Sequence, residues 1–109
     1  MQDEITYKLL KLIEEAPQMS QREIAKKMGV SLGKVNYCLK AMIDKGFIKV
    51  RNFYKNKSKS AYVYFLTPNG LEEKAKVTYR FLHRKMNEFE NIKSEIRRLK
   101  QENANLNKE

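Results

Sequence analysis

The chain has 109 residues, enough for one compact unit with a modest hydrophobic core and too few for a large enzyme cleft. Its formal net charge is +10, and residues 20–60 alone hold eleven Lys and Arg against two acidic residues. A block this basic favours a polyanionic partner, either nucleic acid or an acidic membrane surface.

Targeting, membrane and redox signals are missing from the sequence. The stretch "MQDEITYKLLKL" begins with acidic residues, and nowhere is there a run of about 18 apolar residues, so we expect neither a signal peptide nor a transmembrane helix. Cys38 is the single cysteine, which excludes an intrachain disulfide and a zinc cluster, and we interpret it as a small apolar residue in a helix. These features predict a protein of a reducing cytoplasm with no membrane contact, no cofactor and no metal site.

Apolar spacing and helix-end signals predict two helices in the first thirty residues. Pro17 ends a helix whose apolar face comprises Ile5, Leu9, Leu12, Ile13 and Ala16. Ser20 and Glu23 form a capping box, in which the hydroxyl caps an early backbone amide and the Glu reaches back to the cap amide. Gly29 is placed to end this second helix in the left-handed conformation.

A third helix follows after a short turn. Ser31 can cap it, and it runs to about Lys45, where Gly46 closes it. Its apolar face consists of Val35, Leu39, Met42 and Ile43. Two helices separated by a glycine-centred turn indicate a helix-turn-helix.

The remaining residues predict a hairpin and one long helix. "FIKVRNFY" (47–54) and "AYVYFLT" (61–67) are rich in β-branched and aromatic residues and are joined by the polar loop "KNKSKS" (55–60). Thr67 and Pro68 then start a helix of about 35 residues. The fold class is therefore mainly α with a small β-hairpin. It is a winged helix-turn-helix in residues 1–67, with the wing at about 47–66, followed by a long C-terminal dimerisation helix in 68–109.

Three groups of residues are candidates for contacting nucleic acid. On the third helix they are Ser31, Leu32, Gly33, Lys34, Asn36, Tyr37 and Lys40. At the start of the second helix they are Ser20, Gln21 and Arg22, and in the wing they are Arg51, Asn52, Lys55, Lys57 and Lys59. The major groove of B-DNA, about 12 Å wide, admits a helix, and an Asn side chain can bond both N7 and N6 of adenine. Asn36 is thus the predicted base contact, and Lys40 a predicted phosphate contact.

Other interpretations of the basic block stay open at this stage. The outer face of the third helix is also compatible with ordinary solvated residues, and the basic loop with a solubility device. A winged-helix interaction module that binds an acidic protein is the main alternative, and steep weakening by salt would favour DNA over it. RNA suits the predicted helix less well because the major groove of A-form RNA is deep and narrow.

The long helix predicts a parallel coiled-coil dimer from about residue 89. Its seam comprises Phe89, Ile92, Ile96, Leu99, Asn103 and Leu106 at heptad positions a and d. A parallel pairing sets Glu88 against Lys93 and Glu95 against Lys100 of the other helix, whereas an antiparallel pairing sets Glu against Glu. Asn103 at a single a position also favours a parallel pair. A helix that folds back onto its own domain is the alternative.

Catalysis has no candidate residues. His83 is the only histidine, and no Ser/His/Asp set, Cys/His set or Gly-rich phosphate loop can be assembled around it. We therefore expect that the chain is not an enzyme and that His83 is a packing or solvated residue.

Two longer stretches resemble a known family. "MSQREIAKKMGVSLGKVNYCLKAMIDKGFIKV" (19–50), followed by "YFLTPNGLEEKA" (64–75), resembles MarR-type winged-helix regulators. "SLGKVNYCLKAMIDKGFIK" (31–49) and "LTPNGLEEKAKVTYRFLHRKMNEFE" (66–90) are similar to the short bacterial MarR-family regulators associated with exopolysaccharide biosynthesis loci. The resemblance covers roughly residues 4–100.

The resemblance implies a bacterial, nucleoid-associated regulator that binds duplex DNA sequence-specifically through Ser31 to Lys40, with wing contacts around Arg51 to Lys59, at exopolysaccharide biosynthesis genes. Two domains joined by the predicted homodimer helix would bind an inverted-repeat operator. Larger MarR proteins dimerise through packed N- and C-terminal helices and often bind a phenolic effector there. This chain has one short N-terminal helix and a single long C-terminal helix, so the resemblance leaves a small-molecule effector open.

Overall fold

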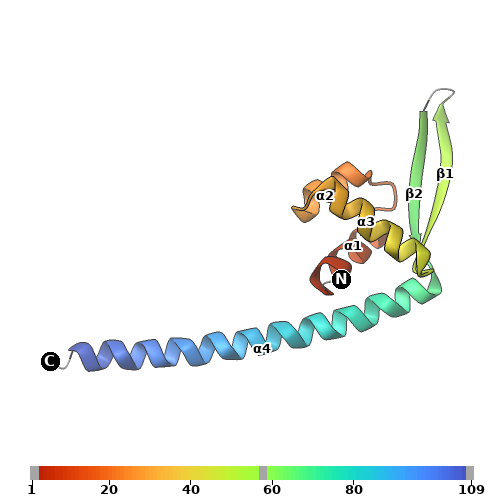
Figure 1. Cartoon of the computed structure of the whole chain (residues 1–109). Helices are drawn as coiled ribbons and strands as arrows, with labels where there is room; N and C mark the ends of the chain where they lie inside the picture. The colour runs from red at the N-terminus through yellow and green to blue at the C-terminus, as the bar shows by residue number, and fades with distance from the viewer. Residues whose placement is uncertain (1–2, 57–58, 108–109) are drawn as a thin grey trace.

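The computed structural model describes residues 3–56 and 59–107, and within them it confirms the predicted fold class. The elements are α1 (Asp3–Glu15), α2 (Gln21–Met28), α3 (Leu32–Asp44), β1 (Ile48–Asn56), β2 (Lys59–Leu66) and α4 (Pro68–Asn107). Figure 1 shows α1, α2, α3 and the hairpin gathered at one end of α4, with the C-terminus at the far end of that helix.

The predicted helix ends are confirmed by their caps. The Ser20 hydroxyl oxygen accepts from the Glu23 amide at 3.2 Å, and the Glu23 carboxylate accepts from the Ser20 amide at 3.4 Å, which completes the capping box. Gly29 ends α2 with φ 69°, a conformation that costs glycine little. Ser31 caps α3 by accepting from the Lys34 amide at 3.1 Å. The capped turn thereby fixes the direction in which α3 leaves α2.

One hydrophobic core joins the three short helices to the base of the hairpin. Its buried members are Leu9, Leu10, Ile13, Ile24, Ala25, Val35, Cys38, Leu39, Met42, Ile48 and Tyr64. Cys38 is 1% exposed and packs as a small apolar residue, as its position in the helix predicted. Four of these side chains belong to α3, so the inner face of this helix is buried in the core.

The hairpin is antiparallel and pairs Ile48 with Leu66 and Arg51 with Val63. The expectation of a loop over residues 55–60 was wrong for the backbone, since the ladder continues, past an irregularity after Tyr54, to the pair Asn56 and Lys59. Backbone pairing needs no apolar side chains, so a polar composition did not stop it. The loop before α2 also joins this sheet, because the Tyr64 amide donates to the Pro17 carbonyl at 3.1 Å.

The start of α4 is locked to the start of the hairpin. The Thr67 hydroxyl donates to the Gly46 carbonyl at 2.5 Å and accepts from the Gly70 amide at 3.0 Å, which confirms Thr67 as the N-cap. Gly70 is buried, and a Cβ there would run into the Phe47 carbonyl oxygen. This close approach of two backbones requires glycine.

The first four turns of α4, to Phe81, pack along α1. Val77 is 1% exposed, and the Phe81 ring stacks on Tyr7 with ring centroids 5.2 Å apart. Phe81 therefore packs on its own domain. These apolar contacts fix the angle between α4 and the rest of the domain.

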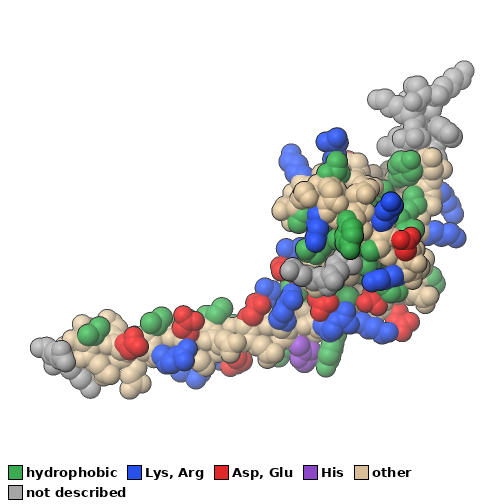
Figure 2. Space-filling view, viewed as in Figure 1, with side chains coloured by type: hydrophobic (Ala, Val, Ile, Leu, Met, Phe, Trp, Pro, Cys, Tyr) green, Lys and Arg blue, Asp and Glu red, His purple; other side chains and the backbone are tan. Residues whose placement is uncertain are grey.

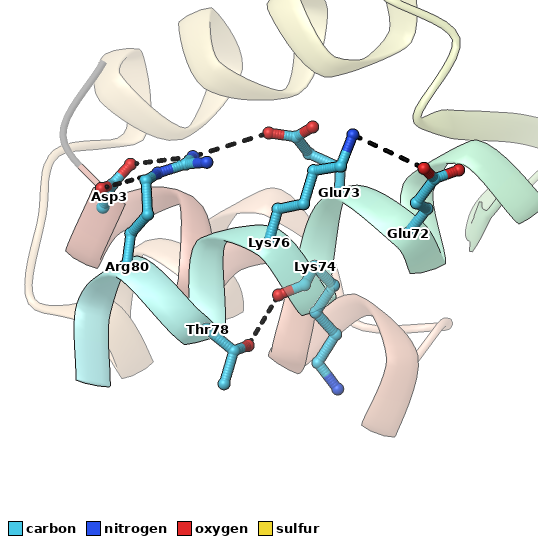
Figure 3. A network of polar contacts seen from close by, with 7 residues as sticks. All are labelled: Asp3, Glu72, Glu73, Lys74, Lys76, Thr78 and Arg80. Atoms are coloured by element: carbon cyan, nitrogen blue, oxygen red, sulfur yellow. Dashed lines mark hydrogen bonds and ion pairs between the residues drawn. The ribbon is translucent and has the colours of Figure 1, made fainter. Parts of the chain in front are cut away.

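Polar contacts flank this apolar contact (Figure 3). The Arg80 guanidinium donates to both Asp3 carboxylate oxygens, at 3.1 and 3.2 Å, and lies 3.7 Å from the Glu73 carboxylate. The hydrogen bond from Arg80 holds the pKa of the Asp3 carboxyl below its ordinary value. On the same helix Lys74 bonds Glu14 at 3.1 Å. Together these contacts tie both ends of α1 to α4.

Beyond Phe81 the long helix leaves the domain. From Leu82 onward its described residues are exposed except for the half-buried Lys93, so this part of the helix does not fold back onto its own domain. The molecule measures 78 × 27 × 20 Å, with a radius of gyration of 20.4 Å against about 13 Å for a compact chain of this size. Within the described residues, no helix combines the length and the apolar character needed to cross a bilayer.

Candidate nucleic-acid interface

The third helix separates its residues cleanly into a buried and an exposed face. Val35, Cys38, Leu39 and Met42 are at most 2% exposed. The opposite side, called here the outer face of α3, consists of Ser31, Leu32, Gly33, Lys34, Asn36, Tyr37 and Lys40, all exposed. Tyr37 is 67% exposed and Leu32 is 37% exposed, so a ring and an aliphatic side chain stand among cations and an amide. This mixture can meet base edges, methyl groups and phosphates alike.

The starts of α2 and α3 add polar groups beside this face. Ser20 and Ser31 use their oxygens as caps, which leaves each hydroxyl hydrogen free as a donor. Arg22 is exposed one residue inside α2. The backbone at Gly33 is open, because a Cβ built there meets nothing within 4 Å.

Three side chains from three elements form a hydrogen-bond chain at this surface. The Asn36 amide nitrogen donates to Gln21 Oε1 at 3.3 Å, and Gln21 Nε2 donates to the Tyr64 hydroxyl at 3.1 Å. Tyr64 is 5% exposed and belongs to the core, whereas Asn36 is exposed. The chain thus runs from the protein interior to the outer face of α3.

The hairpin presents its predicted contacts on two opposite faces. Side chains alternate along a strand, and Arg51 pairs with Val63 while Asn52 pairs with Tyr62. The Arg51 guanidinium lies 5.7 Å from the Phe65 ring centre, on the face toward the loop before α2. Asn52 shares the face that is turned toward α3. Lys57 lies outside the described residues, and so do the side chains of Lys55 and Lys59.

A hollow of about 300 Å³ lies between α3 and the hairpin. Its lining residues are Gln21, Asn36, Leu39, Lys40, Ile43, Val50, Tyr62 and Tyr64. The hydrogen-bond chain of Asn36, Gln21 and Tyr64 therefore forms one wall of the hollow. Residues of α3 and of the hairpin therefore line the same hollow.

Charge is distributed unevenly over the molecule. Figure 2 shows mainly Lys and Arg side chains on the part of the domain away from α4, whereas acidic and basic side chains mix where the domain meets α4 and along the far part of that helix. Within the described residues no group of His, Cys, Asp and Glu could hold a metal ion. His83 lies on α4, with its ring centroid 4.3 Å from that of Tyr79.

Three helices followed by a two-stranded wing define a winged helix-turn-helix. Residues 2–49 match a family model described as "Winged helix-turn-helix DNA-binding". This match covers the three short helices and ends at the start of the wing, so it includes the capped turn and all of α3.

Solved regulators share the fold. The transcriptional regulator SlyA superposes with a TM-score of 0.59 at 22% identity, over 72% of this chain and 54% of that one. Streptococcus pneumoniae FabT in complex with DNA gives 0.56 at 22%, over 76% and 55%. The S. aureus MepR–DNA complex gives 0.61 at 19%, over 80% and 62%. This chain thus spans little more than half the length of these regulators, and no curated protein sequence matches it.

The sequence predicted which residues of α3 are exposed, but it did not predict that Tyr64 contributes a hydrogen bond at this surface. The hydrogen bond from Gln21 to Tyr64 joins residues 43 positions apart, and no local sequence pattern predicts such a contact. The one available signal was strand alternation, which places Tyr62 and Tyr64 on the face that meets α3.

Proposed function

We propose that this chain is a bacterial transcriptional regulator of the MarR type, located at the nucleoid, that binds duplex DNA in a sequence-specific manner. The outer face of α3 carries the proposal. Its residues are exposed, lie on the side opposite the core, and combine cations, an amide and an aromatic ring. Tyr37 and Leu32 add apolar groups of the kind that contact thymine methyl groups in the major groove.

Docking α3 in the major groove assigns each group of residues a role. Helices of this motif contact bases with their N-terminal residues, so Lys34, Asn36 and Tyr37 face base edges. Lys40 and Arg22 stand to the sides, within reach of phosphates. The wing beside α3 then follows the neighbouring backbone or the minor groove, where its cations bind.

The exposed far part of α4 supports a homodimer. Phe89, Ile92, Ile96 and Leu99 are 46–59% exposed in a single chain, and water on so many aligned apolar side chains is unfavourable. A parallel coiled coil covers this seam and brings two winged domains to the same end. Two α3 helices related by a two-fold axis bind an inverted repeat with half-sites about 34–36 Å apart, or a multiple of that distance.

Two further observations support DNA as the partner and suggest a class of target genes. FabT and MepR, which share the fold, were each solved with DNA. The sequence resemblance to short MarR-family regulators makes exopolysaccharide biosynthesis genes the target class we propose. We assign no small-molecule effector.

Selection from random duplexes tests the function. The full chain is expected to enrich an inverted repeat, and its affinity is expected to fall about 1,000-fold between 50 and 200 mM salt, because about six phosphate contacts release counterions. A scrambled duplex of equal length is the control for non-specific binding. If no sequence is enriched and an acidic protein binds instead, the chain is an interaction module. Genome-wide footprinting in the host then tests the exopolysaccharide target.

A further inference from the structure

The hydrogen-bond chain at the DNA-facing surface fixes which groups of Asn36 remain available. A side-chain amide has two donor hydrogens on nitrogen and an acceptor oxygen. Gln21 accepts one of the Asn36 hydrogens at 3.3 Å. One hydrogen and the oxygen are left, which is the donor and acceptor pair that N7 and N6 of adenine require.

The other end of the chain is anchored in the core. Tyr64 is 5% exposed, and its backbone amide is held by the Pro17 carbonyl at 3.1 Å. The Tyr64 hydroxyl accepts from Gln21 Nε2 at 3.1 Å, which leaves Gln21 Oε1 directed at α3. Gln21 is thus bonded at both ends of its amide, with Nε2 toward the Tyr64 hydroxyl and Oε1 toward the Asn36 nitrogen, and in this arrangement Asn36 serves as the donor of the pair.

We propose that Gln21 and Tyr64 are positioning residues that orient the Asn36 amide for adenine before DNA arrives. The proposal rests on the proposed function, since it assumes that Asn36 contacts a base. An exposed Asn otherwise rotates freely, and ordering it during binding reduces affinity. Held by a buried hydroxyl through one intermediate amide, Asn36 loses less freedom on binding and discriminates more sharply between bases.

Tyr64→Phe tests this role because it removes the hydroxyl and keeps the ring that fills the core. The variant is expected to lose about three- to tenfold in the preference for adenine at one base pair, the factor that one hydrogen bond of ordinary strength supplies. Its affinity for a scrambled duplex is expected to stay unchanged. Tyr7→Phe, which removes a hydroxyl on the α1–α4 side of the domain, is the matched control and leaves the preference intact.

Combining Tyr64→Phe with Asn36→Ala shows whether Tyr64 acts by positioning Asn36 or by a general effect on the structure. In the Asn36→Ala background, Tyr64→Phe should cause no further loss of base preference, because the positioned group is gone. An equal loss in both backgrounds, or no loss in either, overturns the positioning role. If the unaltered chain selects no DNA sequence at all, the proposed function itself is wrong. This result can be told apart from the two outcomes above, because they require that the unaltered chain prefers a sequence.

Discussion

The proposed dimer can be tested by substituting one side chain of the seam on the far part of α4. Ile96 is 46% exposed in the single chain. Full burial of an isoleucine side chain stabilises by about 1.5–3 kcal/mol, so covering the exposed half contributes about 1 kcal/mol per helix and about 2 kcal/mol per dimer. Ile96→Ala should therefore raise the dissociation constant of the dimer about 30-fold. Alanine favours the helix, so the monomer itself is not weakened.

Sedimentation equilibrium over a range of protein concentrations measures this constant. Arg97→Ala is the matched control, because Arg97 is exposed on the same turn and lies outside the seam. An unchanged constant for Ile96→Ala, or equal shifts for the two variants, refutes the reasoning. A chain shortened after Arg84 that still formed a tight dimer would show that another surface holds the two copies together.

Three further predictions follow from the domain. Asn36→Ala should cost about 1–3 kcal/mol at one base pair of the operator, whereas Lys40→Ala should weaken operator and scrambled duplexes alike; competition binding against single-base variants distinguishes the two. Gly70→Ala should destabilise the fold by more than about 1 kcal/mol because its Cβ meets a backbone carbonyl, whereas Gly33→Ala, in open space on α3, should stabilise by about 1 kcal/mol; urea unfolding measures both. A carboxyl whose pKa is lowered in the folded state stabilises above its unfolded pKa of about 4, so stability should fall as the pH drops below that value, and thermal unfolding should show a smaller fall for Asp3→Asn.

Local signals accounted for most of the fold. Ser20, Glu23 and Gly29 define the turn before α3 through contacts within three or four residues, and such contacts are visible in sequence. The two faces of α3 followed from periodicity in the same way. The extent of the hairpin did not, because strand pairing depends on the partner strand and not on composition alone.

Contacts distant in sequence were beyond local reasoning. The stacking of Phe81 on Tyr7 and the bonds from Arg80 to Asp3 join residues more than 70 positions apart. Likewise, the exposed position of Asn36 was predicted, and the buried Tyr64 hydroxyl that stands behind it was not. Periodicity identifies which side of a helix is free, but only the packed structure shows what holds a free side chain in place.

Because α4 is continuous from the domain to the seam, its length sets the rotation of the winged domain relative to the seam. No flexible linker separates the contact with α1 from Phe89, since both lie on one 40-residue helix. Each added residue turns a helix by about 100°, so one residue inserted between Arg84 and Phe89 would rotate the winged domain by that angle about the helix axis relative to the seam. The two α3 helices of the proposed dimer would then point away from one face of DNA, although every contact within each domain survived. An insertion of seven residues restores the phase, so the length of this helix, as well as its surface, encodes which operator geometry the dimer accepts.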